Sequence, residues 1–155
     1  MSLKKLRDFL NREQVEYDTI THSPAPTAKQ VAEAAHIPGW EMAKTVMVKI
    51  DGEIAMVVLP ASTKVDFGRL LEATGAQEVE LAHEDEFRHL FPDCAVGAMP
   101  PFGNLFGLRT YIAEELTEDE EIAFNAGTMT EVIKMDYADY ARLVRPRILP
   151  FRITV

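Results

Sequence analysis

Two strongly β-prone runs separated by an Asp-Gly dipeptide constrain the fold of this chain more than any other feature. Residues 45–50 and 53–59 are rich in valine, isoleucine and methionine, and Asp51-Gly52 stands between them. Asp-Gly is preferred in a type I′ turn, because both central residues of that turn take positive φ. The pattern predicts an antiparallel β-hairpin, so we expect the fold to contain a sheet built around it.

Helices and further strands are predicted on both sides of this hairpin. Periodicity predicts helices over residues 2–13, about 27–36, 66–74, 84–90 and 136–144, and strands over 17–21, 78–81, 109–113, 122–125, 131–135 and 148–155. Ser2, Thr27 and Asp136 are the candidate helix caps. Because helices and strands interleave irregularly without a repeat or linker, we expect a single α/β domain of the α+β type over residues 1–155. A mixed β-sheet with flanking helices is the predicted architecture.

Charge and cysteine content limit the compartment and the partners. The formal net charge is -9, from 16 Lys and Arg against 25 Asp and Glu, which argues against broad binding along a nucleic-acid backbone and leaves room for a small local contact. A lone cysteine, Cys94, rules out an intramolecular disulfide. No apolar run is long enough for a membrane span. We therefore expect a cytoplasmic protein that binds neither DNA nor membranes.

Residues 97–107, which read GAMPPFGNLFG, form the second distinctive segment. Its three glycines permit positive φ or a close approach by another group. Pro100-Pro101 fix their own φ and keep the preceding residues extended, so the segment is stiff. A stiff loop with free amides suits a polar ligand, and the alternative is a tight turn that borders the core. The two phenylalanines of the segment belong either to the core or to a base-stacking surface.

Three side chains outside this loop are candidates for chemistry. Lys44 stands at the entrance to the first hairpin strand, where an ammonium can face a phosphate or a carbonyl oxygen, and a solvated lysine is the alternative. His22 precedes a proline-rich turn, where pocket edges form, and a capping or surface histidine is the alternative. Cys94 is a candidate nucleophile, although no histidine neighbours it, so a small buried thiol is the alternative.

Five short motifs occur in an order that is more specific than any one of them. They are Thr27-Ala28 with Val31-Ala32, Ala43-Lys44-Thr45, Leu59-Pro60-Ala61-Ser62, Gly97-Ala98-Met99-Pro100-Pro101-Phe102-Gly103, and Phe124-Asn125-Ala126-Gly127 before Thr130-Glu131. Through them the chain resembles the YbaK / prolyl-tRNA synthetase-associated editing-domain family of aminoacyl-tRNA deacylases over most of its length.

The resemblance implies hydrolysis of the ester between a wrong amino acid and its tRNA, without a metal or an organic cofactor. It implies that Lys44 is the characteristic lysine of the family and that residues 97–101 are its GxxxP loop. Two positions depart from the family pattern. Met129 stands where many members have a histidine, and Thr45 stands where some alanine-specific members have an asparagine.

A mechanism without a covalent nucleophile follows as a hypothesis. Lys44 and Gly97 are the predicted catalytic residues, with the amides of residues 97–99 on the ester carbonyl and Lys44 on the terminal phosphate or ribose. A free ribose hydroxyl of the substrate would then orient the attacking water. Predicted substrate-binding residues are His22, Thr27, Ser62, Ala98, Met99, Pro100, Pro101 and Met129. A pocket closed by two methionines and an alanine favours a small amino acid.

The expected partner is the acceptor end of an aminoacyl-tRNA, with an aminoacyl-tRNA synthetase as a further candidate. Oligomeric state is not predicted. Two other functions compete with a deacylase. One is a non-catalytic module of the same fold that binds an amino acid, a nucleotide or a synthetase, and the other is a thiol hydrolase that uses Cys94. In each case residues 102–107 are expected to anchor the loop to the core.

Overall fold

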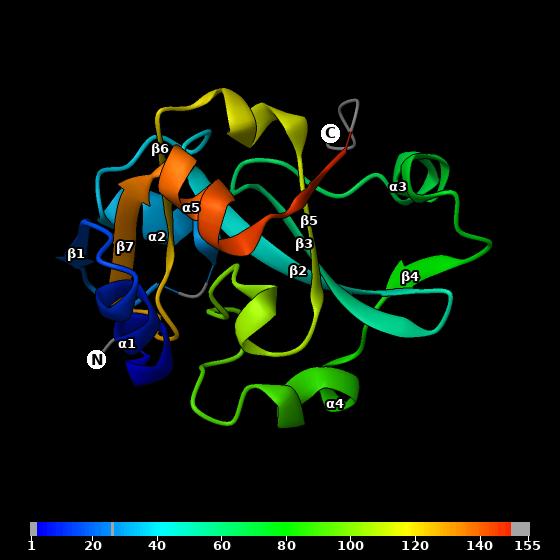
Figure 1. Ribbon diagram of the computed structural model, residues 1–155, viewed down its shortest axis with the longest axis horizontal. Coiled ribbons are helices and arrows are strands. Elements are labelled where there is room, and N and C mark those ends of the chain that lie inside the picture. The colour runs from blue at the N-terminus through cyan, green and yellow to red at the C-terminus, as the bar shows by residue number, and fades with distance from the viewer. Residues whose placement is uncertain (1–2, 26, 150–155) are drawn as a thin grey trace.

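The predicted hairpin forms the centre of the sheet (Figure 1). Strand β2 (Met42–Ile50) pairs antiparallel with β3 (Glu53–Pro60), and the turn residues Asp51 and Gly52 take φ of 50° and 84°. Positive φ at both positions confirms the type I′ turn expected of Asp-Gly. Strand β2 begins earlier than predicted, at Met42, because its first residues also pair in parallel with β6 (Glu121–Asn125).

The structure is a computed structural model that describes residues 3–25 and 27–149. Within these residues the eight strands follow the order β1-β7-β6-β2-β3-β5-β8, and β4 pairs with β2. The other elements are β1 (Tyr17–Thr21), β4 (Val79–Leu81), β5 (Arg109–Ile112), β7 (Glu131–Asp136), β8 (Arg147–Ile148), α1 (Lys4–Arg12), α2 (Ala28–Ala34), α3 (Phe67–Thr74), α4 (Glu84–Phe87) and α5 (Tyr137–Val144). Both parallel and antiparallel pairs occur, which confirms the predicted mixed sheet with flanking helices. Every helix in the described part of the chain is too short or too polar to cross a bilayer.

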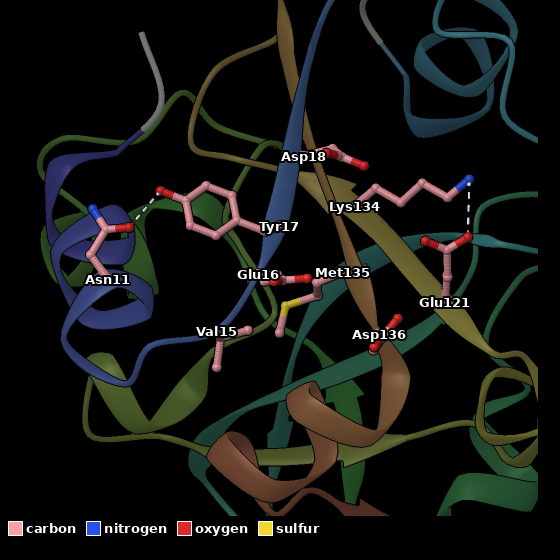
Figure 2. Close-up of a pocket in the computed structure, with 9 residues that line it drawn as sticks. All are labelled: Asn11, Val15, Glu16, Tyr17, Asp18, Glu121, Lys134, Met135 and Asp136. Carbon is pink, nitrogen blue, oxygen red and sulfur yellow. Dashed lines mark hydrogen bonds and ion pairs between the residues drawn. The ribbon is translucent and has the colours of Figure 1, made fainter.

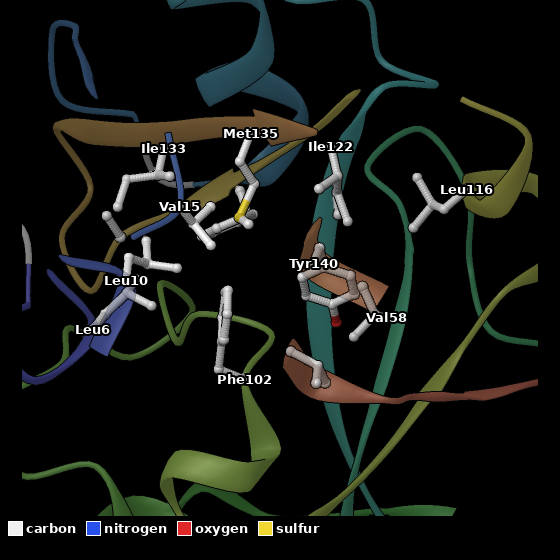
Figure 3. Close-up of a cluster of buried hydrophobic side chains, with 14 of the residues drawn as sticks. Leu6, Leu10, Val15, Val58, Phe102, Leu116, Ile122, Ile133, Met135 and Tyr140 are labelled. Carbon is white, nitrogen blue, oxygen red and sulfur yellow. The ribbon is translucent and has the colours of Figure 1, made fainter. Parts of the chain in front are cut away.

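Alternating side chains assign different helices to the two faces of the sheet. Phe124 of β6 and Ile133 of β7 contribute to a core shared with α1 and α5, which Figure 3 shows around Phe102. Their neighbours Ala123 and Val132 point to the opposite face, where they pack against α2. This alternation decides which side chains of β2 and β6 share a face with α2.

The structure differs from the predicted elements mainly at helix ends. Ser2, the predicted cap of the first helix, lies outside the described residues. Asp136 occupies the N-cap position of α5, but its side chain makes no capping hydrogen bond, so that part of the prediction is wrong. The predicted helix over residues 84–90 is an α-helix only to Phe87 and continues as a 3₁₀ turn. The predicted last strand is described only as far as residue 149.

An aromatic cluster anchors the second half of the glycine-rich loop. Phe102 is fully buried, and its ring meets the rings of Phe9, Phe124 and Tyr140 edge-on. The Tyr140 hydroxyl donates a 2.6 Å hydrogen bond to the carbonyl oxygen of Pro101. Phe102 therefore belongs to the core and is not available to stack on a base. The cluster holds the loop at Pro101 and Phe102. This anchoring makes the first half of the loop rigid as well.

Removal of the Tyr140 hydroxyl should destabilise the fold, whereas removal of the Tyr137 hydroxyl should not. In Tyr140→Phe the buried carbonyl of Pro101 loses its donor, so the free energy of unfolding should fall by about 1–2 kcal/mol. The Tyr137 hydroxyl is buried without a partner in the described residues, so Tyr137→Phe should leave that free energy unchanged or raise it. Urea unfolding measures both variants, and equal effects would contradict the anchoring role of Tyr140.

Candidate active site

Lys44 lies within β2, two residues after Met42, so its side chain projects from the sheet face that carries α2. The side chain is partly buried. Burial lowers the pKa of its ammonium, and the nearby charge of Lys64 lowers it further. Across residues 3–25 and 27–149, no carboxylate forms an ion pair with Lys44. A partly desolvated cation without a counter-ion favours an anionic ligand.

Two other lysines of the sheet show the structural alternative. Lys49 Nζ lies 2.7 Å from a carboxylate oxygen of Glu86 and 3.0 Å from one of Glu80. Lys134 is also paired with two carboxylates. Hydrogen bonds to these carboxylates raise the pKa of both lysines. The pKa of Lys44 shifts in the opposite direction, which separates it from the lysines that stabilise the fold.

Asn125, the last residue of β6, stands beside Lys44. The parallel pairs Met42 with Ala123 and Ala43 with Phe124 make Lys44 and Asn125 the next residues on their strands, and both project from the α2 face. Asn125 is only 4% exposed, and its side-chain oxygen has no hydrogen-bond partner in the described residues. A buried amide oxygen without a donor is costly, so this position is ready to accept a hydrogen bond.

The first half of the glycine-rich loop is attached to the chain just after β6. The amide of Ala95 donates to the carbonyl of Gly127 at 2.8 Å, and the amide of Gly127 donates to the carbonyl of Ala98 at 2.9 Å. Gly97 lies between these bonds, exposed and with φ of 87°. A Cβ atom added at Gly97 would lie 3.1 Å from Cε of Met129. Glycine is therefore required there by its φ and by the neighbouring methionine.

The amides of residues 97–99 are not equivalent, contrary to the expectation that all three face the carbonyl. The amide of Ala98 already donates to the carbonyl of Ala95 at 3.0 Å. In the described residues the amides of Gly97 and Met99 donate no hydrogen bond. The Met99 side chain packs in a core cluster, and Pro100 is buried together with Pro101. Residues 98–101 thus support the loop, and Gly97 is its exposed amide.

The structure places His22 on the α2 side of the sheet, across β7 from Asn125. Its amide donates to the carbonyl of Thr130 at 2.9 Å, and it follows Ile20, which packs in the α2 cluster, by two residues. His22 Nδ1 lies 2.8 Å from the carbonyl oxygen of Ser23 and must be the donor. In the neutral ring Nε2 is then an acceptor, buried without a partner in the described residues.

Thr27 and Ser62 are both exposed at the surface. Thr27 is exposed and caps α2, since its hydroxyl accepts a hydrogen bond from the amide of Gln30 at 3.2 Å. Ser62 is exposed in the segment between β3 and α3. A Cβ atom added at Gly39 would lie 3.3 Å from Cβ of Ser62, so this segment packs against the turn before β2.

Cys94 has the properties of a packed thiol rather than of a nucleophile. It is partly buried and packs against two core clusters. Burial, with a smaller contribution from Asp93, raises the pKa of the thiol to about 11. Only a very small fraction is thiolate near neutral pH, which argues against covalent catalysis by Cys94.

A large cavity lies at the other end of β6. It has a volume of about 660 Å³ and is lined by Asn11, Val15, Glu16, Tyr17, Asp18, Glu121, Lys134, Met135 and Asp136 (Figure 2). Its one cation, Lys134, points toward Glu121 at 3.5 Å, and three further carboxylates surround it. Such a hollow repels phosphate groups. We therefore place the candidate site at the Asn125 end of β6 and not in this carboxylate-lined cavity.

Lys44, Gly97 and Met129 were predicted from the sequence, whereas Asn125 was given no role. Lys44 follows the β2–β6 pairs, and Met129, beyond the end of β6, lies against Gly97. The signal was present in the strand pattern. Ile122 and Phe124 alternate with Ala123 on the other face, and Asn125 continues the face of Ala123 with a polar side chain. A polar residue at an inward position directly before a glycine turn marks such a site.

Comparison with known proteins identifies the family of this chain. The sequence profile described as "Aminoacyl-tRNA editing domain" matches residues 22–143. The chain is 28% identical to the Multifunctional Ser/Thr-tRNA deacylase ProXp-y of Escherichia coli K12, over 97% of this chain and 93% of that protein. The chain is also 37% identical to proline–tRNA ligase 1 of Streptomyces avermitilis over 62 residues. These residues make up 40% of this chain and 11% of that protein.

Solved structures share the fold at low sequence identity. The protein APE2540 superimposes with a TM-score of 0.84 at 16% identity and covers 98% of this chain and 100% of its own. A candidate trans-editing enzyme for prolyl-tRNA synthetase gives 0.79 at 18% identity, over 96% of this chain and 95% of that one. With the sequence profile covering most of its length, this chain belongs to the aminoacyl-tRNA editing domain family.

Proposed function

We propose that this protein acts in trans, in the cytoplasm, as a deacylase that hydrolyses the ester bond of a mischarged tRNA carrying a small amino acid. The observation that carries the proposal is Lys44, a partly buried ammonium without a carboxylate partner in the described residues. It follows the residues of β2 that pair with β6, and the loop of Gly97 is hydrogen-bonded to Gly127 just after β6. Serine and threonine are the first candidate substrates, because the full-length relative is named for them.

Lys44 and Gly97 divide the substrate between them in this proposal. Lys44 binds a phosphate or the ribose at the tRNA terminus, and the exposed amide of Gly97 donates to the ester carbonyl oxygen. Water adds to the carbonyl carbon, the bond to the ribose oxygen breaks, and that oxygen keeps a proton from the water. The products are a free amino acid and a tRNA with its terminal hydroxyl restored. His22 Nε2 offers an acceptor for a substrate hydroxyl.

The contact between Gly97 and Met129 supports a small amino acid. The Met129 Cε atom already approaches to 3.1 Å of the position that a Cβ on Gly97 would take, and Ala98 is fully buried beneath it. A large amino-acid side chain would have to displace the methionine. Size exclusion of this kind is worth about 10- to 200-fold per methylene in a close-fitting pocket.

Loss of the Lys44 charge should abolish most of the activity. With a panel of mischarged tRNAs, Lys44→Ala should lower kcat/KM by at least about 100-fold, because the cation that holds the tRNA terminus in place is removed. Lys44→Arg keeps the charge but not its compact geometry and should recover only part of the loss. Lys4→Ala, on the exposed side of α1, is the matched control and should behave as wild type. Full activity of Lys44→Ala would remove Lys44 from the mechanism.

The same panel separates the deacylase from the competing binding module. A wild-type protein that retains charged tRNA in a filter assay but releases no amino acid from any tRNA is a non-catalytic member of the fold. In that case a synthetase or the charged tRNA itself is the ligand, and Lys44→Ala should weaken retention instead of turnover.

Truncation of Met129 should widen the range of accepted amino acids. In Met129→Ala the space beside Gly97 opens, so deacylation of valyl- or leucyl-tRNA relative to seryl-tRNA should rise by at least about 10-fold. Met47→Ala, a truncation of a buried methionine in another core cluster, controls for a general loosening of the fold. An unchanged ratio in Met129→Ala would show that another group limits substrate size.

Replacement of Cys94 should leave the reaction intact. Since the raised pKa keeps the thiol protonated, Cys94→Ala should deacylate within about twofold of wild type once corrected for folded protein. Thiol alkylation of the wild type, followed by the same assay, gives an independent measurement. Loss of turnover in the folded Cys94→Ala variant would favour the thiol hydrolase.

A further inference from the structure

The side chain of Asn125 is the most buried polar group at the candidate site, and its bonds are incomplete. It is 4% exposed, and neither end of its amide makes a hydrogen bond in the described residues. Leaving such an acceptor unpaired costs more than a neutral hydrogen bond contributes. Buried polar groups without a hydrogen-bond partner are uncommon in native proteins, so we expect a donor for the side-chain oxygen of Asn125.

Another buried polar atom without a hydrogen-bond partner shows that an unpaired polar atom alone does not define a binding site. The hydroxyl of Tyr137 is also buried without a partner in residues 3–25 and 27–149. Tyr137 belongs to α5 and packs against the core on the opposite face of the sheet. Asn125 differs because it adjoins Lys44 and precedes Gly127, whose amide holds the loop of Gly97.

The position of Asn125 limits the chemistry of its partner. Its neighbour Lys44 does not bond to it, although both project from one face, and Lys44 is reserved for the tRNA terminus in the proposed function. A donor of the substrate fits this position, close to the ester carbonyl that Gly97 holds in the proposed function. Every aminoacyl ester carries a donor on the carbon next to the carbonyl, the α-amino group, whereas the free ribose hydroxyl is assigned to the attacking water.

We propose that the side-chain oxygen of Asn125 accepts a hydrogen bond from the α-amino group of the esterified amino acid. Asn125 is then a substrate-positioning residue, and this inference rests on the proposed function for the identity of the substrate. A neutral acceptor suits this place better than a carboxylate, which would pair with Lys44 and block its anion site. The positive charge of Lys44 favours the neutral amine, which still donates.

A double-mutant cycle between protein and substrate tests the contact. Wild type and Asn125→Ala are each assayed with seryl-tRNA and with 3-hydroxypropionyl-tRNA, in which serine lacks its amino group. On seryl-tRNA the variant should lose about 10- to 100-fold in kcat/KM, because the buried amino group of the substrate is left without its acceptor. On the desamino substrate wild type and variant should be equal. An equal loss on both substrates would overturn the inference, because Asn125 would then hold the water, the ribose or Lys44.

The matched control is Tyr137→Phe, which removes a buried unpartnered atom from the other face. It should show wild-type kinetics on both substrates, and urea unfolding should show that every variant is folded. Asn125→Ser, whose shorter side chain keeps a hydroxyl, serves if Asn125→Ala does not fold, and the same pattern is expected. A loss in Tyr137→Phe that matches the loss in the Asn125 variant would mean that the kinetics report fold stability, which overturns the inference.

Binding of a stable analogue separates this inference from the proposed function. Seryl-3′-amino-3′-deoxyadenosine, whose amide resists hydrolysis, and its desamino analogue are titrated calorimetrically. Wild type should prefer the amino analogue about 10-fold or more, and Asn125→Ala should lose that preference. If this pattern appears while no mischarged tRNA is hydrolysed, the deacylase proposal fails and the contact stands. If wild type deacylates tRNA but shows no preference, the contact fails and the deacylase stands.

Discussion

The continuity of the sheet depends on a short parallel contact between β2 and β6. The pairs Met42 with Ala123 and Ala43 with Phe124 join the β1-β7-β6 side to the β2-β3-β5-β8 side, and all four residues are almost fully buried. Their side chains alternate between the helix layers, so the contact contributes to the cores on both faces. The next residues along the two strands are Lys44 and Asn125. The contact that unites the sheet therefore also assembles the candidate site.

This coupling explains how the fold tolerates polar groups without partners. An unpaired acceptor at Asn125 and an unpaired ammonium at Lys44 each reduce stability, and neither is free to move away, because each follows directly on a buried strand pair. The surrounding hydrophobic burial offsets the cost. Lys49, farther along β2, shows the ordinary solution, in which carboxylates neutralise the charge. Unpaired polar groups on these two strands occur at the end of β6, as expected where ligand binding rather than stability determines which residue stands at a position.

Local sequence was enough to predict the elements whose boundaries are set by their own residues. Asp51-Gly52 specified the hairpin turn, and the helix predicted over residues 66–74 is α3, which begins after the cap Asp66 and ends before Gly75 in the left-handed conformation. The start of β2 at Met42 was not predictable, because pairing with β6, about 80 residues away, creates it. Asp136 is a residue type that commonly caps helices, but here it is the last residue of β7 and its side chain makes no capping hydrogen bond. Helix-cap propensity alone therefore predicted a hydrogen bond that does not form.

The candidate site was predictable only in part for the same reason. Lys44 and Gly97 were predicted because short local sequence marks them. Lys44 lies in a three-residue motif, and Gly97 lies in a segment whose glycines and prolines specify an unusual backbone. Asn125 lay in a quoted motif, yet its role depends on which face of β6 it occupies and on its neighbour in β2. Met99 and Pro100 carried the loop motif, although the structure uses them for packing. Motifs located the region, and the topology separated its ligand-facing residues from its supports.

The two ends of β6 differ in charge, which decides how an acidic protein can meet an RNA. Glu121 begins the strand beside a carboxylate-lined hollow, and Asn125 ends it beside the unpaired charge of Lys44, with Lys64 nearby. The strand spans about 13 Å between these residues, which exceeds the screening length of about 8 Å at physiological ionic strength. A charged group near one end of the strand therefore experiences mainly the electrostatic potential of that end, despite the net charge of -9. In the proposed function, repulsion at the Glu121 end leaves the Lys44 end as the place where an acceptor strand binds.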